Sequence, residues 1–177
     1  RYKQMSNAGF WRGVLPAIPT PFTAGGKVDH AFLADHAKRL VAAGCTGLVP
    51  LGSLGESATL TFDEKVAIVR TLVAAVEGRV PVVPGIAALS TAEGVALVQA
   101  VKAAGAGGAM VLPPYVYSSD AHEMGAYIRA ILTATDMPVL LYNNPGKTMV
   151  PISLAATLEL AQVPSIVGIK DASGSLA

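Results

Sequence analysis

The sequence predicts an α/β fold, a (β/α)8 or TIM barrel, of which about six β/α units are present in this chain. Three observations support this prediction. Apolar runs rich in β-branched residues recur roughly every 30 residues, which is the length of one βαβ unit. The segments between them have a helical period and begin with capping sequences. The runs are apolar throughout rather than alternating, as in parallel strands that helices cover on both faces.

The predicted strands follow one another without a linker or a low-complexity tract. They are 13–22, 47–52, 80–86, 107–114, 138–144 and 165–171. An open doubly wound sheet is the alternative architecture, and it should carry G-x-G-x-x-G after its first strand. The first turn reads "TPFTAGGKVD" and does not match, while "GAGGAM" precedes a strand instead of following one. The barrel is therefore preferred, and because a full barrel has eight units and about 250 residues, this chain carries part of one.

Five helices are predicted between these strands, and their ranges are 29–44, 61–78, 90–105, 120–134 and 151–163. The pairs Thr61/Glu64 and Ser90/Glu93 mark the starts of the second and third, and Pro151 suits the first turn of the fifth. The first helix ends in a glycine suited to the C′ position. Its residues near one face are Phe32, Leu33, His36, Leu40 and Val41.

Composition excludes several classes of protein. The 177 residues are 52% hydrophobic and 14% charged with a net charge of +1, which excludes a disordered chain, and no basic stripe suits nucleic acid. No apolar run reaches the roughly 18 residues of a membrane span, and "RYKQMSNAGFW" has no signal-peptide core. The single Cys45 is expected to be a buried, inert thiol without an intramolecular disulfide, which fits the cytoplasm. Residues 1–12 are predicted as an N-terminal extension and 13–177 as the partial barrel.

Polar side chains stand where the predicted strands end, and in a barrel those carboxyl ends form the active-site face. Ser53, Tyr115, Tyr142 and Lys170 are therefore expected to face one mouth, with Tyr117 as an alternative to Tyr115. Burial disfavours a charged ammonium, and a neutral lysine amine attacks ketones to form a Schiff base. A neighbouring phenol can donate and accept the protons of that reaction. The alternative for Lys170 is a structural ion pair with Asp171.

Three motifs carry a resemblance to a known family. "GSLGE" follows the second predicted strand, "YNNP" ends the fifth and "GIKDASG" ends the sixth, in the order and at the separations expected. The chain resembles the dihydrodipicolinate synthase/N-acetylneuraminate lyase family of Schiff-base-forming barrels from about Gly13 to Gly174. The resemblance implies a class I aldolase-type lyase or synthase that acts on pyruvate or a related 2-oxo acid.

The resemblance also implies site residues. Lys170 matches the lysine that attacks C2 of pyruvate, Tyr142 the phenol that shuttles protons, and Ser53 the hydroxyl that relays protons and contacts the substrate carboxylate. The backbone N–H groups of Ser53, Leu54 and Gly55 would hold that carboxylate. Tyr115 matches a tyrosine that enters the neighbouring subunit's site, which implies a homodimer or homotetramer.

Two positions depart from the family pattern. Leu54 replaces the usual second hydroxyl residue of the turn, which removes one donor to the carboxylate. Lys147 replaces the usual arginine that binds the carboxylate of aspartate semialdehyde, and it keeps the charge without the bidentate fork. Both departures leave Schiff-base chemistry intact. The hypotheses are a dihydrodipicolinate-synthase-like enzyme, a sialic-acid or sugar-acid lyase, or a 2-oxo acid dehydratase or deaminase.

Two alternatives involve no catalysis: a homologue that only binds 2-oxo acids, and an inactive fragment. No cofactor is expected, because the lysine imine itself supplies the chemistry. No metal site is expected either, since His30, His36 and His122 lie on predicted helices without ligand-spaced partners. "GSLGES" is not the G-x-S-x-G elbow of serine hydrolases. The expected partner is a small 2-oxo acid, with an aldehyde as second substrate in the synthase case.

Overall fold

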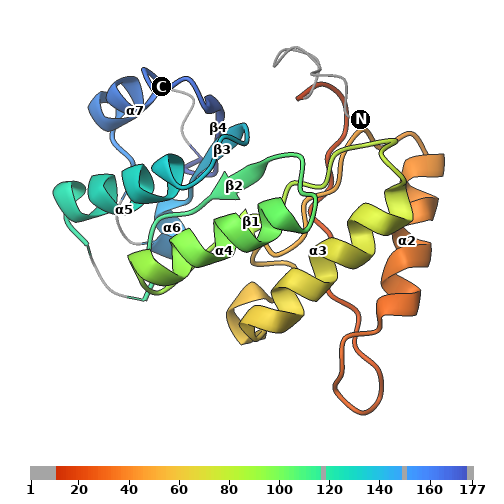
Figure 1. The fold of residues 1–177 in the computed structure, drawn as a ribbon. Coiled ribbons are helices and arrows are strands. Elements are labelled where there is room, and N and C mark those ends of the chain that lie inside the picture. The colour runs from red at the N-terminus through yellow and green to blue at the C-terminus, as the bar shows by residue number, and fades with distance from the viewer. Residues whose placement is uncertain (1–10, 117–118, 149–150, 175–177) are drawn as a thin grey trace. The chain divides into compact units, whose positions relative to one another are not determined.

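The structure is a computed structural model that describes residues 11–116, 119–148 and 151–174. The chain divides into two units, which are described separately. The first comprises the residues up to Gly85 together with Ala100–Gly108, and the second comprises Ile86–Gln99 together with the residues from Ala109 onward. From residue 62 onward helices and strands alternate along the chain, except that two helices follow one another within residues 145–160 (Figure 1).

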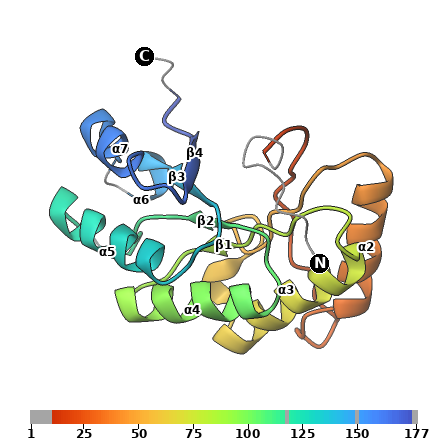
Figure 2. The ribbon, with the colours of Figure 1, turned by 45° about the horizontal axis from the view of Figure 1, so that its top comes forward.

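The first unit is built around two helices that pack along each other, α2 (His30–Ala42) and α3 (Phe62–Val76), as Figure 2 shows. It also holds the short 3-10 helix η1 (Ser57–Thr59), Gly85 of β1 (Gly85–Ile86) and the last residues of α4 (Thr91–Ala103). Its core consists of aliphatic side chains from the helices and the strand-like segments between them. Fully buried members are Leu33, Leu48, Leu51, Ile68 and Leu72.

The first predicted strands are shorter than the sequence suggested. Ranges 13–22 and 47–52 contain isolated bridges instead of strands: two are parallel, at Ala17–Val49 and Leu48–Val82, and one is antiparallel, at Phe22–Val28. The hydrogen bonds themselves are parallel in pattern, for example from Ile18 N to Val49 O at 3.1 Å and from Val49 N to Pro16 O at 3.0 Å. Prolines interrupt the ladder because a proline has no N–H to donate, so each can only accept. These segments therefore pair with the neighbours expected for the barrel, but through isolated bridges instead of continuous strands.

Local capping explains where the helices begin and end. Thr61 caps α3 in a capping box, in which its hydroxyl accepts from Glu64 N and the Glu64 carboxylate accepts from Thr61 N at 2.8 Å. Ser90 accepts from Glu93 N at the start of α4, and α2 is followed by Gly44 with φ +95°. These features confirm the predicted helix boundaries, because each uses side chains within three residues of the cap.

The predicted face of α2 is wrong for one residue. Leu33 is buried, but the Phe32 side chain is 52% exposed. Its ring stacks on His36 with centroids 6.2 Å apart, and the Arg39 guanidinium lies 5.4 Å from its centroid. Ala37, which was not in the predicted set, takes the buried position because it follows Leu33 by four residues. Cys45 is half-buried rather than buried.

Removing the α3 cap should destabilise the first unit measurably. We expect Thr61→Ala to lower the free energy of unfolding by about 1 kcal/mol, because Glu64 N loses its acceptor. Thr133→Ala is the matched control, since that exposed hydroxyl only bonds back to Arg129 O within its own helix. Urea unfolding of both variants checks this, and equal losses would contradict the importance of the cap.

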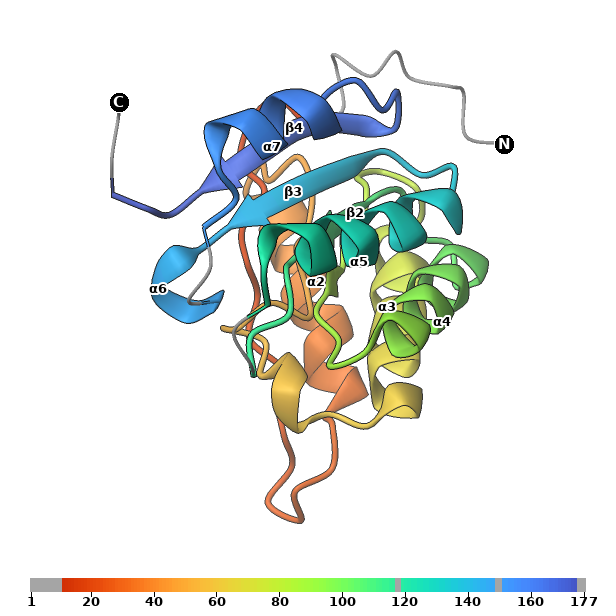
Figure 3. The ribbon, with the colours of Figure 1, turned by 90° about the vertical axis from the view of Figure 1, so that its left-hand side faces the viewer.

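The second unit contains β2 (Ala109–Val111), α5 (Ala121–Thr133), β3 (Val139–Asn143), α6 (Pro145–Thr148), α7 (Leu154–Leu160) and β4 (Ile166–Asp171). The sheet order is β1-β2-β3-β4, and β2–β3 and β3–β4 are parallel (Figure 3). Strands in chain order with a helix between parallel neighbours are the repeating unit of the predicted barrel. The α5 face toward the sheet buries Met124, Ile128 and Ile131.

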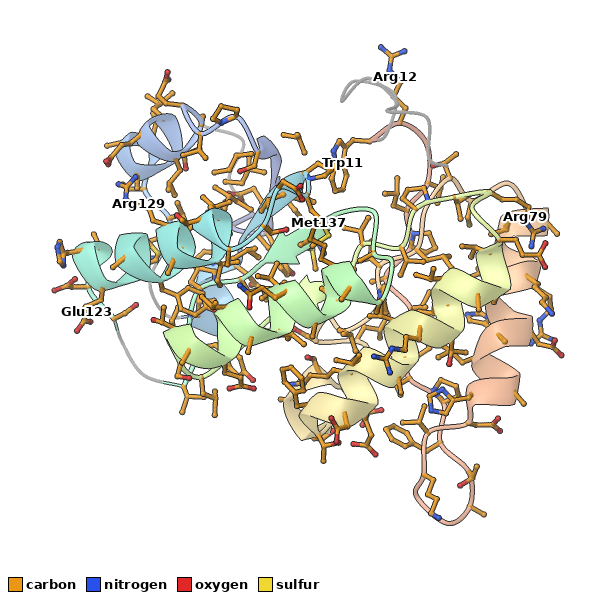
Figure 4. All side chains as sticks on the ribbon, in the orientation of Figure 1. Trp11, Arg12, Arg79, Glu123, Arg129 and Met137 are labelled. Carbon is orange, nitrogen blue, oxygen red and sulfur yellow. The ribbon has the colours of Figure 1, made fainter. Side chains whose placement is uncertain are left out.

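The fifth predicted helix is wrong at its start. Residue Pro151 is exposed and not helical, and α7 begins at Leu154 with Ser153 as its cap, whose hydroxyl accepts from Ala156 N. A serine side chain satisfies a free N–H of the first turn, which proline cannot do. The unpredicted α6 begins at Pro145. Arg129 of α5, labelled in Figure 4, forms an exposed ion pair with Glu159 of α7.

Candidate active site

Tyr142 and Lys170 form a cross-strand pair in the second unit. They lie opposite each other near the carboxyl ends of the parallel strands β3 and β4. Lys170 Nζ lies 4.1 Å from the centroid of the Tyr142 ring, within cation–π range. The structure therefore brings these two predicted residues together. Their roles in a reaction are a separate matter.

Lys170 is exposed in the described structure, whereas the sequence pattern suggested an amine in an apolar pocket. Among the described residues β4 is the outer strand of the sheet, so no strand there covers its outer side. The burial pattern along β4 follows from this: its first three residues are half-buried and its last three are exposed. Tyr142, on the neighbouring strand, is half-buried.

A hollow of about 240 Å³ lies on the other side of the strand pair. Its lining comes from α7, β4 and Leu141 of β3, and it is mostly apolar: Leu141, Thr157, Ala161, Ile166, Val167, Gly168 and Ile169. Leu141 and Ile169 pair with each other one position before Tyr142 and Lys170. Successive residues of a strand point to opposite faces, so this hollow and the lysine–tyrosine pair belong to different faces of the sheet.

The Tyr142 hydroxyl accepts a hydrogen bond from Asn144 Nδ2 at 3.0 Å. Asn144 is fixed in turn, because its carbonyl accepts from Thr148 N at 2.9 Å and from Thr148 Oγ1 at 3.1 Å across the single turn of α6. The short helix thus holds a donor at the phenol oxygen. The motif "YNNP" gave no role to its two asparagines at the sequence level, and the structure assigns contacts to both.

Asp171 is not the partner of Lys170, which rules out the structural ion pair considered from the sequence. Its carboxylate accepts from Asn143 Nδ2 at 2.7 Å and from Ser173 N at 2.7 Å, and among the described residues no ion pair joins it to Lys170. The Ser173 hydroxyl donates to the same carboxylate. The hydrogen bonds from Ser173 and then from Asn143 lower the pKa of Asp171 below its ordinary value.

The lowered pKa of Asp171 predicts a pH dependence of stability. A carboxyl whose pKa is lower in the folded state contributes stability above its unfolded pKa, ordinarily 3.8, and loses it as the pH falls through the folded value. We therefore expect Asp171→Asn to melt below the parent at neutral pH and the gap to narrow as the pH falls below 3.8. Melting both proteins across this range checks the sign, and a gap that widens in acid would contradict it.

The Ser53 turn lies in the first unit. Ser53 and Leu54 are exposed and Gly55 is buried. Leu51 and Glu56 flank the turn with φ of 61° and 54°, and Gly55 O accepts from the buried Thr20 hydroxyl at 2.7 Å. A Cβ at position 55 would lie 3.1 Å from Ile18 O, so the turn needs a glycine there. The tight turn leaves the Ser53 hydroxyl at the surface of its unit.

Glu56 and Ser57, which follow this turn, differ in their hydrogen bonds. Glu56 precedes η1, and its side chain makes no capping hydrogen bond there. Instead its carbonyl accepts from Thr59 N and from the Thr59 hydroxyl at 2.9 Å. Ser57 begins η1, is 3% exposed, and has no hydrogen-bond partner for Oγ among the described residues.

The remaining predicted residues lie in the second unit. Tyr115 is half-buried after β2, and burial, followed by the nearby charge of Glu93, raises its pKa, so the phenol stays protonated at neutral pH. The backbone of Lys147 lies in α6. Tyr117 lies outside the described residues. In the described ranges no cluster of three metal-ligating side chains occurs, and no helix there is long and apolar enough to cross a membrane.

Comparison with known proteins gives consistent results. The sequence model of the Dihydrodipicolinate synthetase family matches residues 11–177. The chain is 44% identical to a 4-hydroxy-tetrahydrodipicolinate synthase of Phenylobacterium zucineum over 94% of its own length and 56% of that protein, and 42% identical to one of Natronomonas pharaonis over 93% and 55%. It spans little more than half the length of these curated relatives.

Solved structures agree with the predicted architecture. The dihydrodipicolinate synthase of Cyanidioschyzon merolae with lysine bound matches with a TM-score of 0.91 and 33% identity, over 94% of this chain and 57% of that one. The enzyme of Acinetobacter baumannii complexed with pyruvate matches with a TM-score of 0.89 and 34% identity, over 93% and 56%. The prediction of a TIM barrel, present in part, is confirmed.

Proposed function

The chain belongs to the dihydrodipicolinate synthetase family, and from this premise we propose that it carries the imine-forming centre of a pyruvate-dependent, 4-hydroxy-tetrahydrodipicolinate synthase-like enzyme. One observation supports the proposal most directly: Lys170 Nζ lies 4.1 Å from the Tyr142 ring where two neighbouring parallel strands end. That edge is where barrel enzymes place their reacting groups. The named relatives point to the same activity.

In the proposed reaction the neutral Lys170 amine attacks C2 of pyruvate, and the carbonyl oxygen takes up a proton to give a carbinolamine. The Tyr142 phenol then donates a proton to the departing oxygen, which leaves as water, and an imine forms between Nζ and C2. Loss of a proton from C3 gives an enamine. The enamine carbon attacks the carbonyl of an aldehyde to form a carbon–carbon bond.

The other predicted residues have proposed binding roles. Ser53 would relay protons, and the backbone N–H groups of Ser53, Leu54 and Gly55 would hold the pyruvate carboxylate, as oriented amides can. Lys147 would attract the carboxylate of the aldehyde substrate as a point charge. Tyr115 would enter the site of a neighbouring subunit, as the family resemblance implies.

The wider setting is also proposed. The reaction needs no cofactor, because the lysine imine is itself the electron sink that stabilises the C3 carbanion. The small-molecule partners are a 2-oxo acid and an aldehyde, with no nucleic acid or membrane involved. A homodimer or homotetramer in the cytoplasm is the form proposed for the whole protein; this chain spans 56% of the length of the Phenylobacterium relative.

Reductive trapping tests the proposal. The chain is incubated with pyruvate and borohydride and then digested, and we expect the peptide of Lys170 to gain the mass of pyruvate less one water plus two hydrogens. The Phenylobacterium relative serves as positive control. An adduct on the relative and none on this folded chain would contradict the proposal. Turnover with aspartate semialdehyde, compared with cleavage of N-acetylneuraminate, then separates a synthase from a lyase.

A further inference from the structure

The register between β3 and β4 changes within the strand pair. Val139 pairs with Ile166, but the next residue, Leu140, pairs with Gly168, so Val167 is an extra residue on β4. This is a β-bulge, which inserts one residue into one strand of a pair. From the bulge onward every pair is displaced by one residue relative to the register at the start of the strands.

This displacement decides which residue faces Tyr142. Without the bulge Tyr142 would lie opposite Ile169, and Asn143 would lie opposite Lys170. Because side chains alternate between the two faces of a sheet, a slip of one residue moves each side chain to the other face. The lysine would then share a face with Asn143 and lie on the side opposite the Tyr142 ring. The contact of 4.1 Å therefore depends on the shifted register.

A hydrogen-bonded pair holds the shifted register immediately after the lysine. Asn143 lies opposite Asp171 and donates to its carboxylate at 2.7 Å. The Asn143 side chain is 5% exposed, and its Oδ1 accepts from Ile152 N at 3.0 Å, which attaches the segment before α7. Its backbone carbonyl accepts from Ala172 N at 2.9 Å. In the unshifted register Asn143 would lose Asp171 and face Lys170 instead.

The bulge itself is packed closely. A Cβ at Gly168, the residue after the extra one, would lie 3.2 Å from the Leu140 side chain, which would have to shift slightly to admit it. The bulge and the Asn143–Asp171 pair thus bracket the segment that carries Lys170. Ser173 completes the pair by donating its N–H and hydroxyl to Asp171. The strands β3 and β4 lie side by side along this segment in Figure 3.

We propose that Asn143 and Asp171 are positioning residues, whose cross-strand hydrogen bond fixes the register that places Lys170 over the Tyr142 ring. They act from the face of the sheet opposite the lysine. The catalytic meaning of this inference rests on the proposed function, but the register itself does not. The two parts can therefore be tested separately.

Exchanging the two side chains is the sharpest test. In Asp171→Asn two amides face each other and the donor Nδ2 of Asn143 loses its carboxylate; in Asn143→Asp two carboxylates face each other. The double variant Asn143→Asp/Asp171→Asn restores every bond. The new amide at position 171 donates to the new carboxylate at position 143, and its oxygen accepts from Ser173. The carboxylate at position 143 still accepts from Ile152 N. Glu159→Gln, an exposed carboxylate-to-amide change on α7, is the control.

Two measurements read the result. In protein carrying 13C at lysine Cε, the Lys170 signal, identified by its loss in Lys170→Arg, should show an upfield ring shift that Tyr142→Leu removes. We expect each single exchange to lose that shift and to slow trapping of pyruvate on the order of 100-fold, and the double exchange to restore both. Asp171 is exposed, so its single variant should keep the fold.

The outcomes separate the two proposals. Single variants that keep the parent's Lys170 signal and trapping rate would overturn the positioning role, as would a folded double variant that behaves like the singles. The ring shift could be present in the parent, lost in the single variants and restored in the double variant, while the parent traps no pyruvate. That result would support the register inference and overturn the proposed function. Loss of the shift in Glu159→Gln would also count against a specific role for the pair.

Discussion

Lys170→Arg should abolish the reduced pyruvate adduct, lowering its rate of formation by at least about a thousand-fold. The guanidinium keeps the positive charge and can still lie over the Tyr142 ring, but it stays protonated and does not attack a ketone. The change therefore removes the nucleophile with little disturbance of the site. Because Lys170 is exposed, the variant is expected to melt close to the parent. Mass spectrometry after borohydride treatment measures the loss.

Lys38→Arg is the matched control for this prediction. Lys38 is an exposed residue of α2, so the same substitution there should leave the adduct unchanged. Borohydride can also trap pyruvate on other surface amines, and this background should be equal in both variants. An adduct that survives in Lys170→Arg at the parent's level would place the imine on another lysine and remove the basis of the proposed function.

The helices were largely predictable from the sequence because their signals are local. A capping box such as Thr61/Glu64 is complete within four residues, and so is the Ser90 cap of α4. The strands were harder, because a ladder depends on a partner distant in sequence. Around Pro16 and Pro81 the expected strands became isolated bridges, and at Pro151 a weak helix-start signal was mistaken for the true cap, Ser153.

The sequence predicted which residues of the candidate site stand at strand ends, but not which face of the sheet each side chain occupies or how exposed it is. Parallel neighbours end at the same edge, so Tyr142 and Lys170 could be expected to lie near each other from their positions alone. Whether they share a face depends on the bulge at Val167, which the alternation of side chains cannot reveal. Exposure of Lys170 was likewise not predictable, because it depends on which elements flank β4.

Tyr142→Phe should slow imine formation about 100-fold or more while leaving Lys170 in place. The phenylalanine ring keeps the face over which Nζ lies, so the cation–π contact survives. What disappears is the hydroxyl, the proposed proton donor to the departing water, together with the hydrogen bond that it accepts from Asn144. Loss of that bond should lower the free energy of unfolding by about 1 kcal/mol. The kinetic effect is expected to be far larger than the effect on stability.

Tyr127→Phe provides the comparison that separates these two effects. Tyr127 is a buried residue of α5 in the same unit, and removing its hydroxyl should leave the trapping rate within about two-fold of the parent. If both variants slowed trapping equally, the loss at position 142 would reflect weakened packing of the unit. A slow Tyr142→Phe that keeps the ring-shifted Lys170 signal, beside an unaffected Tyr127→Phe, would assign the loss to the phenol proton itself.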